Sequence, residues 1–134
     1  MAKVCGIEIK GSAAIIVVLE GETTNFKVIP TKFKKLSLED STNQAEVKAF
    51  YQTISEFFKT HQFDKIGIKA RGTKGKFAGG ATTFKIEGLI QLTDSPVILM
   101  HGATIKVRLK KETVVFEGVN SYQLEAMRLG YCLL

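Results

Sequence analysis

The chain has few side chains suited to covalent or metal chemistry. Its 134 residues include two cysteines and two histidines, all widely separated. Cys5 and Cys132 lie in apolar surroundings near opposite ends, which indicates buried, reduced thiols rather than a disulfide framework. No cysteine–histidine spacing matches a zinc site, and no histidine accompanies a serine or cysteine in a nucleophile motif. The composition therefore argues against a disulfide scaffold, a zinc-stabilised domain and hydrolysis by a catalytic triad.

Long hydrophobic runs are also missing. The longest, residues 13–19, has seven residues, whereas a helix needs about 20 to cross a bilayer. The first residues enter a strand pattern at once and lack the apolar run of a signal peptide. We therefore expect a cytoplasmic protein with no membrane partner. A length of 134 residues predicts one domain, residues 1–134.

Acidic residues are absent from residues 65–86, and this gap accounts for the charge of the chain. The formal net charge is +6, which equals the number of basic residues in the gap. These are Lys65, Lys69, Arg71, Lys74, Lys76 and Lys85. Five glycines share the segment. Because glycine lacks a Cβ, such a loop can bring backbone N–H groups and cationic side chains close to one anion.

The basic, glycine-rich segment predicts a phosphate-bearing ligand, most of all nucleic acid, with nucleotide phosphate as the smaller alternative. The residues assigned to phosphate binding are Lys69, Arg71, Lys74, Lys76, Gly79, Gly80 and Thr82. The loop leads into an expected helix whose N-terminus attracts anions, and it does not match the Walker A motif. The alternative is a solvated connection, in which Phe77 either anchors the loop on the core or stacks on a base.

Hydrophobic patterning predicts the secondary structure. Apolar runs at 4–9 and 13–19, joined by Lys10-Gly11-Ser12, predict a hairpin, and residues 23–29 predict a third strand. Helices are expected at three places: over residues 43–61 with Asn43 as cap, from Thr82 or Thr83 onward, and after a capping pair of Asn120 with Gln123. Further strands are expected at 63–70 and 97–100.

Three parts of this pattern are less regular. Residues 31–42 predict a loop. Residues 104–111 alternate as an edge strand protected by Lys106, Arg108 and Lys110, although a short helical turn fits as well. Gly88 lies inside the second expected helix, where it weakens the helix, so we expect it to mark close packing on the sheet.

The order of elements resembles that of the RNase H-like fold, which includes resolvases. The opening Gly6-Ile7-Glu8-Ile9-Lys10-Gly11-Ser12 resembles the G-I-D-x-G-S opening of that fold. The whole chain also resembles an uncharacterised bacterial family, domain of unknown function 3010, through Val4-Cys5-Gly6-Ile7-Glu8-Ile9-Lys10-Gly11 and Lys74-Gly75-Lys76-Phe77-Ala78-Gly79-Gly80. The resemblance implies an α/β fold: a mixed five-stranded sheet, with three antiparallel strands followed by a parallel β-α-β unit, and helices on both faces.

Nucleases of this fold hold two divalent cations, about 3.5–4 Å apart, between carboxylates of the first strand, the fourth strand and the final helix. The resemblance places Glu8 at the first of these positions. Tyr122-Gln123-Leu124-Glu125-Ala126 resembles the resolvase D-x-x-D-A pattern, which places Glu125 at the last acid and Tyr122 at the other. The fourth strand has Lys69 where a carboxylate is required, and Glu87 or Glu117 is a possible replacement.

Lys69 decides which function we expect. An ammonium at a metal-ligand position repels a divalent cation, and it can instead form ion pairs with Glu8 and Glu125. We therefore expect nucleic-acid binding without full two-metal catalysis and without a certain cofactor. One alternative is an Mg²⁺- or Mn²⁺-dependent nuclease that uses Glu8 and Glu125 as catalytic and metal-binding residues. Another is a non-catalytic, homodimeric protein-interaction module. For Glu8 itself, the alternative to a functional role is a surface ion pair with Lys10 or Lys69.

Overall fold

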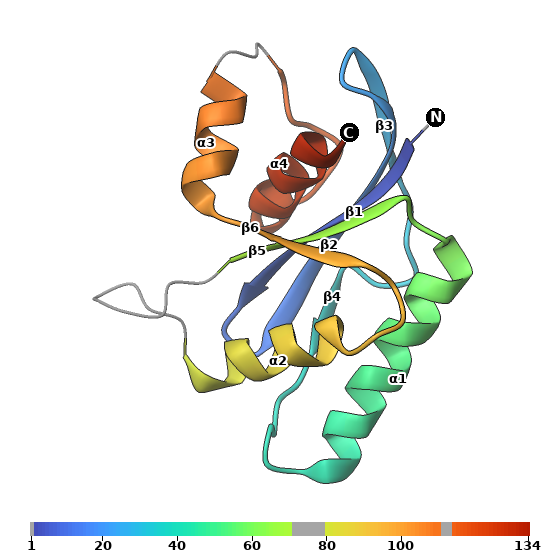
Figure 1. The fold of residues 1–134 in the computed structure, drawn as a ribbon, viewed down its shortest axis with the longest axis vertical. Helices are drawn as coiled ribbons and strands as arrows, with labels where there is room; N and C mark the ends of the chain where they lie inside the picture. The colour runs from blue at the N-terminus through green and yellow to red at the C-terminus, as the bar shows by residue number, and fades with distance from the viewer. Residues whose placement is uncertain (1, 71–79, 111–113) are drawn as a thin grey trace.

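A mixed β-sheet with helices on both faces forms the body of the protein (Figure 1). The structure is a computed structural model that describes residues 2–70, 80–110 and 114–134. Its elements are β1 (Ala2–Lys10), β2 (Ala13–Glu22), β3 (Asn25–Ile29), β4 (Lys35–Ser37), α1 (Gln44–His61), β5 (Lys65–Lys69), α2 (Ala81–Gln91), β6 (Val97–Met100), α3 (Gly102–Lys110), a 3₁₀ turn (Ser121–Gln123) and α4 (Leu124–Leu133).

The strands lie in the order β3-β2-β1-β5-β6. β1, β2 and β3 pair in antiparallel fashion, whereas β5 lies parallel to β1 and β6 parallel to β5. This confirms the predicted arrangement of three antiparallel strands followed by a parallel β-α-β unit. One strand was not predicted: β4, inside the expected loop, pairs with the first residues of β2 and makes the sheet six-stranded. Its three residues are too few to show a strand pattern.

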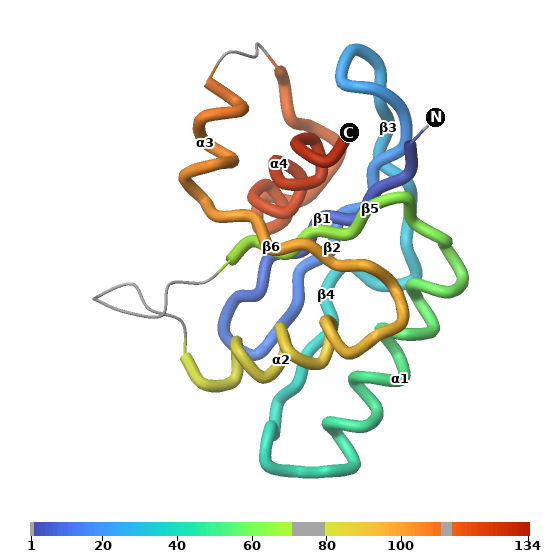
Figure 2. The backbone as a smooth tube through the Cα atoms, in the orientation of Figure 1, coloured from blue at the N-terminus to red at the C-terminus, as the bar shows by residue number. Residues whose placement is uncertain are grey.

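Side chains of the central strands alternate between two hydrophobic clusters, one on each face of the sheet. Cys5, Ile7 and Ile9 of β1 belong to the cluster under α1 and α2, whereas Val4 belongs to the cluster under α3 and α4. Both faces of β2 are buried in the same way, as its nearly continuous apolar sequence predicts. Figure 2 shows the two helix pairs on opposite sides of the strands.

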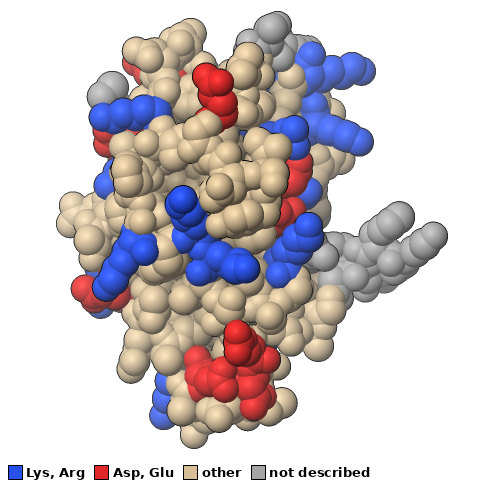
Figure 3. Space-filling view, turned by 180° about the vertical axis from the view of Figure 1, so that it is seen from behind, with Lys and Arg blue, Asp and Glu red and all other residues tan. Residues whose placement is uncertain are grey.

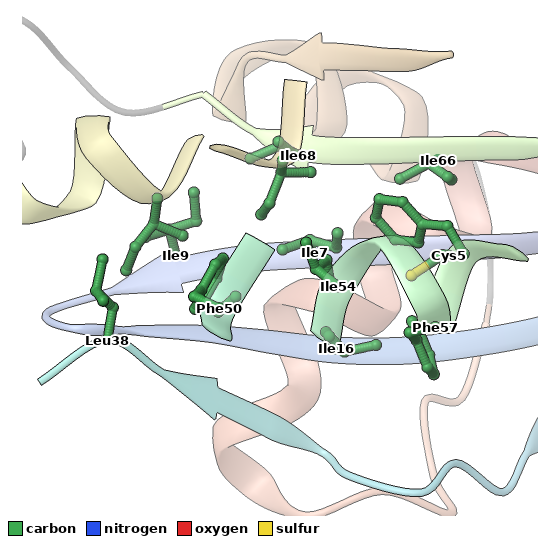
Figure 4. Close-up of a cluster of buried hydrophobic side chains, with 14 of the residues drawn as sticks. Cys5, Ile7, Ile9, Ile16, Leu38, Phe50, Ile54, Phe57, Ile66 and Ile68 are labelled. Atoms are coloured by element: carbon green, nitrogen blue, oxygen red, sulfur yellow. The ribbon is translucent and has the colours of Figure 1, made fainter. Parts of the chain in front are cut away.

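The predicted amphipathic helix is present as α1. The Asn43 side chain accepts a hydrogen bond from the Glu46 N–H group, at 3.1 Å, and so caps the helix as its sequence indicates. Phe50, Ile54 and Phe57 point from one face of α1 into the cluster that contains Ile7 and Ile16 (Figure 4). The capping pair of Asn120 with Gln123 is also confirmed, and it precedes the turn that leads into α4.

The region from α2 to α3 differs from the sequence-based expectation. Gly80, not a threonine, is the N-cap of α2, and the Thr83 hydroxyl donates to the Gly80 carbonyl from inside the helix. Residues 102–110 form a helix rather than an edge strand. The His101 carbonyl accepts the N–H groups of Thr104 and Ile105, and this starts α3. Ile105 is buried, while the three basic side chains of the helix are exposed.

No helix in the described ranges is long and apolar enough to span a membrane.

Cys5 and Cys132 are free thiols, and burial raises the pKa of both. For Cys132 this effect exceeds the opposing charge of Arg108.

The helix α4 lies against β1 at a point where both backbones carry glycine. A Cβ built on Gly6 would lie 2.7 Å from the Gly130 nitrogen and would also overlap the Ala126 carbonyl oxygen. Both are backbone atoms, which cannot move aside without shifting the helix. By contrast, a Cβ on Gly88 would meet nothing within 4 Å among the described residues. The expected close packing at Gly88 is therefore wrong.

The two glycines predict opposite effects of one substitution. Gly6→Ala should lower the free energy of unfolding by about 1–3 kcal/mol or more, because it overpacks the contact between β1 and α4. Gly88→Ala should raise it by about 1 kcal/mol, because alanine stabilises a helix interior where space is open. Urea unfolding followed by circular dichroism measures both changes. Equal effects at the two positions would contradict the assigned contact.

Candidate functional site

The adjacent C-terminal ends of β1 and β5 place a carboxylate beside an ammonium. The parallel register pairs Ile7 with Ile68, so the residues that follow, Glu8 and Lys69, are neighbours across the two strands. Because Ile7 and Ile68 face the cluster under α1 and α2, Glu8 and Lys69 point to the other face, toward α4. Strand alternation therefore places both side chains on the face of the sheet that carries α4.

Glu125 reaches the same point from the first turn of α4. The Lys69 ammonium lies 3.0 Å from Glu125 Oε2 and 3.9 Å from Glu8 Oε2. The other Glu125 oxygen, Oε1, accepts a hydrogen bond from Arg128, one turn further along α4. We call Glu8, Lys69, Glu125 and Arg128 the carboxylate–lysine cluster. The ion pairing of Lys69 with both carboxylates, expected from the sequence, is present.

The two carboxylates of the cluster differ in how they are surrounded. Glu8 is buried, with 8 % of its surface exposed. For Glu125, burial raises the pKa, but hydrogen bonds and charge from Lys69 and Arg128 outweigh burial and hold the pKa below its ordinary value. Two carboxylates and two cations therefore satisfy one another without an added ion.

The cluster does not fit a pair of divalent cations. A two-metal site needs several oxygen ligands around each ion, and here an ammonium lies within 4 Å of both carboxylates. In the part of the chain that the structure describes, no group of three or more aspartate, glutamate, histidine or cysteine side chains is placed to hold a metal. Glu87 and Glu117, considered as replacements, therefore do not complete such a group.

A groove runs from the cluster along the space between α3 and α4. Its volume is about 970 Å³. It is lined by Lys69, Gly102, Ala103, Ile105, Lys106, Val107, Leu109, Lys110, Glu125 and Arg128. Four of these residues are basic and one is acidic. A groove with this excess of positive charge and with apolar walls can accept an anionic ligand and attract it from solution.

A second group of cations lies around β4, near the 3₁₀ turn that precedes α4. Lys34 and Lys35 are exposed, and the Lys35 ammonium lies 6.0 Å from the centre of the Tyr122 ring, three residues before Glu125. Tyr122, which the resemblance placed at an acid position, contributes an exposed ring instead. Figure 3 shows Lys and Arg side chains gathered across the middle of the face opposite to that of Figure 1.

The structure brings together some of the residues assigned from the sequence. Glu8, Lys69 and Glu125 meet in the cluster. Gly80 and Thr82 lie at the start of α2, where the Thr82 hydroxyl is 3.4 Å from that of Ser41. Four assigned phosphate-binding residues and the loop aromatic lie outside the described residues: Arg71, Lys74, Lys76, Gly79 and Phe77.

Arg128 was not identified from the sequence, although it belongs to the cluster. The available signal was its spacing: a basic residue three positions after a glutamate lies on the same face of a helix. The basic side chains of α3 were identified, but they were placed on a strand rather than on the wall of a groove. The signal for the groove is absent from local sequence, because it requires α3 and α4 to be placed side by side.

Glu125 predicts a pH-dependent contribution to stability. Its pKa is lower in the folded chain than its ordinary value of 4.5, so its pairing stabilises the fold above that pH and is lost as the pH falls through the folded pKa. Glu125→Gln should lower the free energy of unfolding by about 1 kcal/mol or less near neutral pH. The difference from wild type should vanish in acid.

Urea unfolding of both proteins across the acidic range measures this difference. Glu117→Gln is the matched control, because Glu117 is exposed. A difference between wild type and Glu125→Gln that stays constant with pH would contradict the assigned ion pairs.

Two solved structures are similar to this chain over nearly its whole length. The Thermus thermophilus RuvC structure matches with a TM-score of 0.73 and 10% sequence identity, and the match covers 96% of this chain and 91% of that one. T. thermophilus RuvC in complex with a Holliday junction substrate matches with a TM-score of 0.75 and 10% identity, covering 98% and 92%. These matches confirm the RNase H-like, resolvase-like fold.

Sequence comparison identifies the family. No curated protein matches the chain. Residues 2–133 match the family described as "Protein of unknown function (DUF3010)". This family is the one that the sequence motifs resemble, and the match spans almost the entire chain. The chain therefore belongs to the DUF3010 family and has an RNase H-like fold.

Proposed function

We propose that this domain binds nucleic acid through the basic surface around the carboxylate–lysine cluster and does not carry out two-metal catalysis. The observation that supports this most directly is the position of the Lys69 ammonium, within 4 Å of both carboxylates and at the end of a basic groove. The similar fold of a protein solved in complex with a Holliday junction substrate also favours a nucleic-acid ligand.

The argument against catalysis is electrostatic. A nuclease of the two-metal type uses its cations to clamp the attacking and leaving oxygens of a phosphodiester. The Lys69 ammonium donates a hydrogen bond to Glu125 and forms an ion pair with Glu8, but it activates no water molecule as a metal ion does. Lys69 and Arg128 together balance the charge of Glu8 and Glu125, and an unpaired carboxylate would be costly at the buried position of Glu8.

The argument for binding is the number and placement of cations. Lys106 and Lys110 line the groove outside the ion pairs of the cluster, and Lys34 and Lys35 are exposed around β4. Phosphates bound along such a surface release counterions, so the affinity falls steeply with salt. The cations Arg71, Lys74 and Lys76 of the glycine-rich segment, together with the N–H groups of Gly79 and Gly80, would add phosphate contacts. The cytoplasmic location expected from the sequence stays a prediction.

Binding is tested with labelled single-stranded DNA, duplex DNA, a four-way DNA junction and RNA at several salt concentrations. We expect binding with a slope of log affinity against log salt of several units. The double variant Lys74→Gln/Lys76→Gln should reduce the slope on duplex by about 1.8, because each lost phosphate contact removes about 0.9.

Lys48→Gln/Lys59→Gln is the matched control for this experiment. It removes the same charge from exposed positions of α1, on the face of the sheet opposite to the cluster. Its slope should remain that of wild type if the charge acts locally. No binding at low salt, or an equal loss in both double variants, would contradict the proposed surface.

The second candidate is a divalent-metal-dependent nuclease. It is favoured by the convergence of Glu8 and Glu125 on one point, as the resemblance to resolvases implies. We expect wild type to bind no Mn²⁺ at the cluster, and Lys69→Glu to gain Mn²⁺ binding because the cation is replaced by a third carboxylate. Lys69→Gln is the control, since it removes the ammonium without adding a ligand.

Calorimetric titration with Mn²⁺ and a cleavage assay on the same substrates separate the two candidates. Cleavage by wild type that requires Mn²⁺ and is lost in Glu8→Gln, with folding intact, would establish the nuclease. It would also overturn the role assigned to Lys69.

A further inference from the structure

Tyr122 presents an aromatic ring to solvent, whereas the other two tyrosines of the chain are engaged in the fold. Its side chain is 43% exposed, while Tyr131 is buried in the cluster under α3 and α4. The Tyr51 hydroxyl donates to the Leu92 carbonyl, at 3.5 Å. Exposure of one aromatic ring does not by itself indicate a binding site, so the surroundings of Tyr122 decide what it can do.

The backbone that carries Tyr122 is fixed to the central sheet. The neighbouring Gln123 is buried, and its side-chain Nε2 donates to the Ile16 carbonyl of β2, at 3.0 Å. The Oε1 atom of the same side chain accepts from the Asn120 N–H group, also at 3.0 Å. These two bonds hold both sides of the turn. A ring on a backbone held in this way loses little conformational entropy when it binds a ligand.

The same part of β2 holds a cation beside the ring. Lys35 of β4 pairs with Ile15, the residue next to Ile16. Its ammonium lies 6.0 Å from the centre of the Tyr122 ring, and the preceding Lys34 is exposed as well. Neither lysine takes part in the ion pairs of the described residues. Two positive charges therefore stand near the ring and are available to an anion.

Tyr122 also shares a side of the final helix with the carboxylate–lysine cluster. The 3₁₀ turn at Ser121–Gln123 continues directly into α4. Residues three positions apart face the same side in both types of helix, as Glu125 and Arg128 do in their ion pair. Tyr122, Glu125 and Arg128 thus form one row, which leads from the ring to the wall of the groove.

We propose that Tyr122 is a stacking platform for an unpaired nucleobase, so that this surface takes a nucleic-acid strand with unpaired bases. The inference rests on the proposed nucleic-acid binding and names the form of nucleic acid. The base lies against the ring, while Lys34 and Lys35 meet the neighbouring phosphates. A base inside a duplex is stacked between its own neighbours and has no free face. Because every base has such a face, the contact tolerates any sequence.

The cations beside the ring favour a nucleic-acid strand over other partners of an aromatic side chain. A sugar ring or an aliphatic side chain also packs against tyrosine, but neither carries the negative charge that two lysines attract. One nucleotide of a single strand supplies both a flat base and a phosphate. DNA and RNA share this chemistry.

The test compares an oligothymidine strand with a strand of the same length whose sugars carry no base. Both have the same phosphates, so their affinities differ only through the bases. We expect wild type to prefer the base-bearing strand. Tyr122→Ala should reduce this preference by about five- to a hundredfold, the range typical of one base stacked on an aromatic ring. Tyr122→Phe should keep it, because phenylalanine retains the ring.

Two controls separate stacking from a general defect. Leu92→Ala removes an apolar side chain that is 68% exposed at the end of α2, and it should bind both strands as wild type does. The affinity of Tyr122→Ala for duplex DNA should equal that of wild type. An oligouridine strand shows whether RNA is taken as well, and circular dichroism verifies the fold of each variant.

Tyrosine fluorescence gives a second readout, because the chain contains no tryptophan. A stacked base quenches the emission of the tyrosine that it covers. The base-bearing strand should therefore quench wild type and Tyr51→Phe. It should leave Tyr122→Phe unquenched, although that variant still binds.

The outcomes distinguish this inference from the proposed function. A wild type that binds none of the strands or the duplex at low salt would contradict both. Salt-sensitive binding with equal affinity for the two strands would overturn the stacking role alone. The same conclusion would follow if Tyr122→Ala kept the preference for bases, or if it lost as much affinity for duplex as for the single strand.

Discussion

The close approach of β1 and α4 at Gly6 and Gly130 is the constraint on which the candidate site depends. Two backbones come within contact distance only where neither residue carries a side chain between them. This contact places the first turn of α4 over the C-terminal ends of β1 and β5, so Glu125 reaches Lys69. A larger residue at Gly6 would lift α4 away and separate Glu125 from the two strand residues.

Given that contact, a single ammonium determines the character of the site. The Lys69 ammonium pairs with both Glu8 and Glu125, and Arg128 supplies the second cation of the cluster. Of the basic residues on the groove walls, Lys106 and Lys110 are exposed and lie outside the ion pairs of the cluster, so their positive charge is not used to balance it. That charge remains available to an anionic ligand, which is why the same geometry supports binding and argues against metal-assisted cleavage.

Local sequence predicted correctly those features that depend on a single strand or a single helix. Alternation in β1 assigned Ile7 and Glu8 to opposite faces, and Asn43 and Asn120 marked the helix starts that they cap. It failed at residues 102–110, because an alternating pattern of apolar and basic residues fits a strand and a short helix equally well. It also missed β4, whose strand character comes from its pairing with β2.

The sequence by itself determined the class of fold, the orientation of Glu8 opposite to Ile7 and Ile9, and the positive charge of the glycine-rich segment. These follow from side-chain periodicity, turn chemistry and composition, which are local properties. Only the tertiary structure decided that Arg128 pairs with Glu125, that α3 and α4 enclose a groove, and that β6 is the last strand of the sheet in the described ranges. The last two depend on the packing of segments that are far apart in the chain, and a local sequence pattern does not reveal which distant segments pack together.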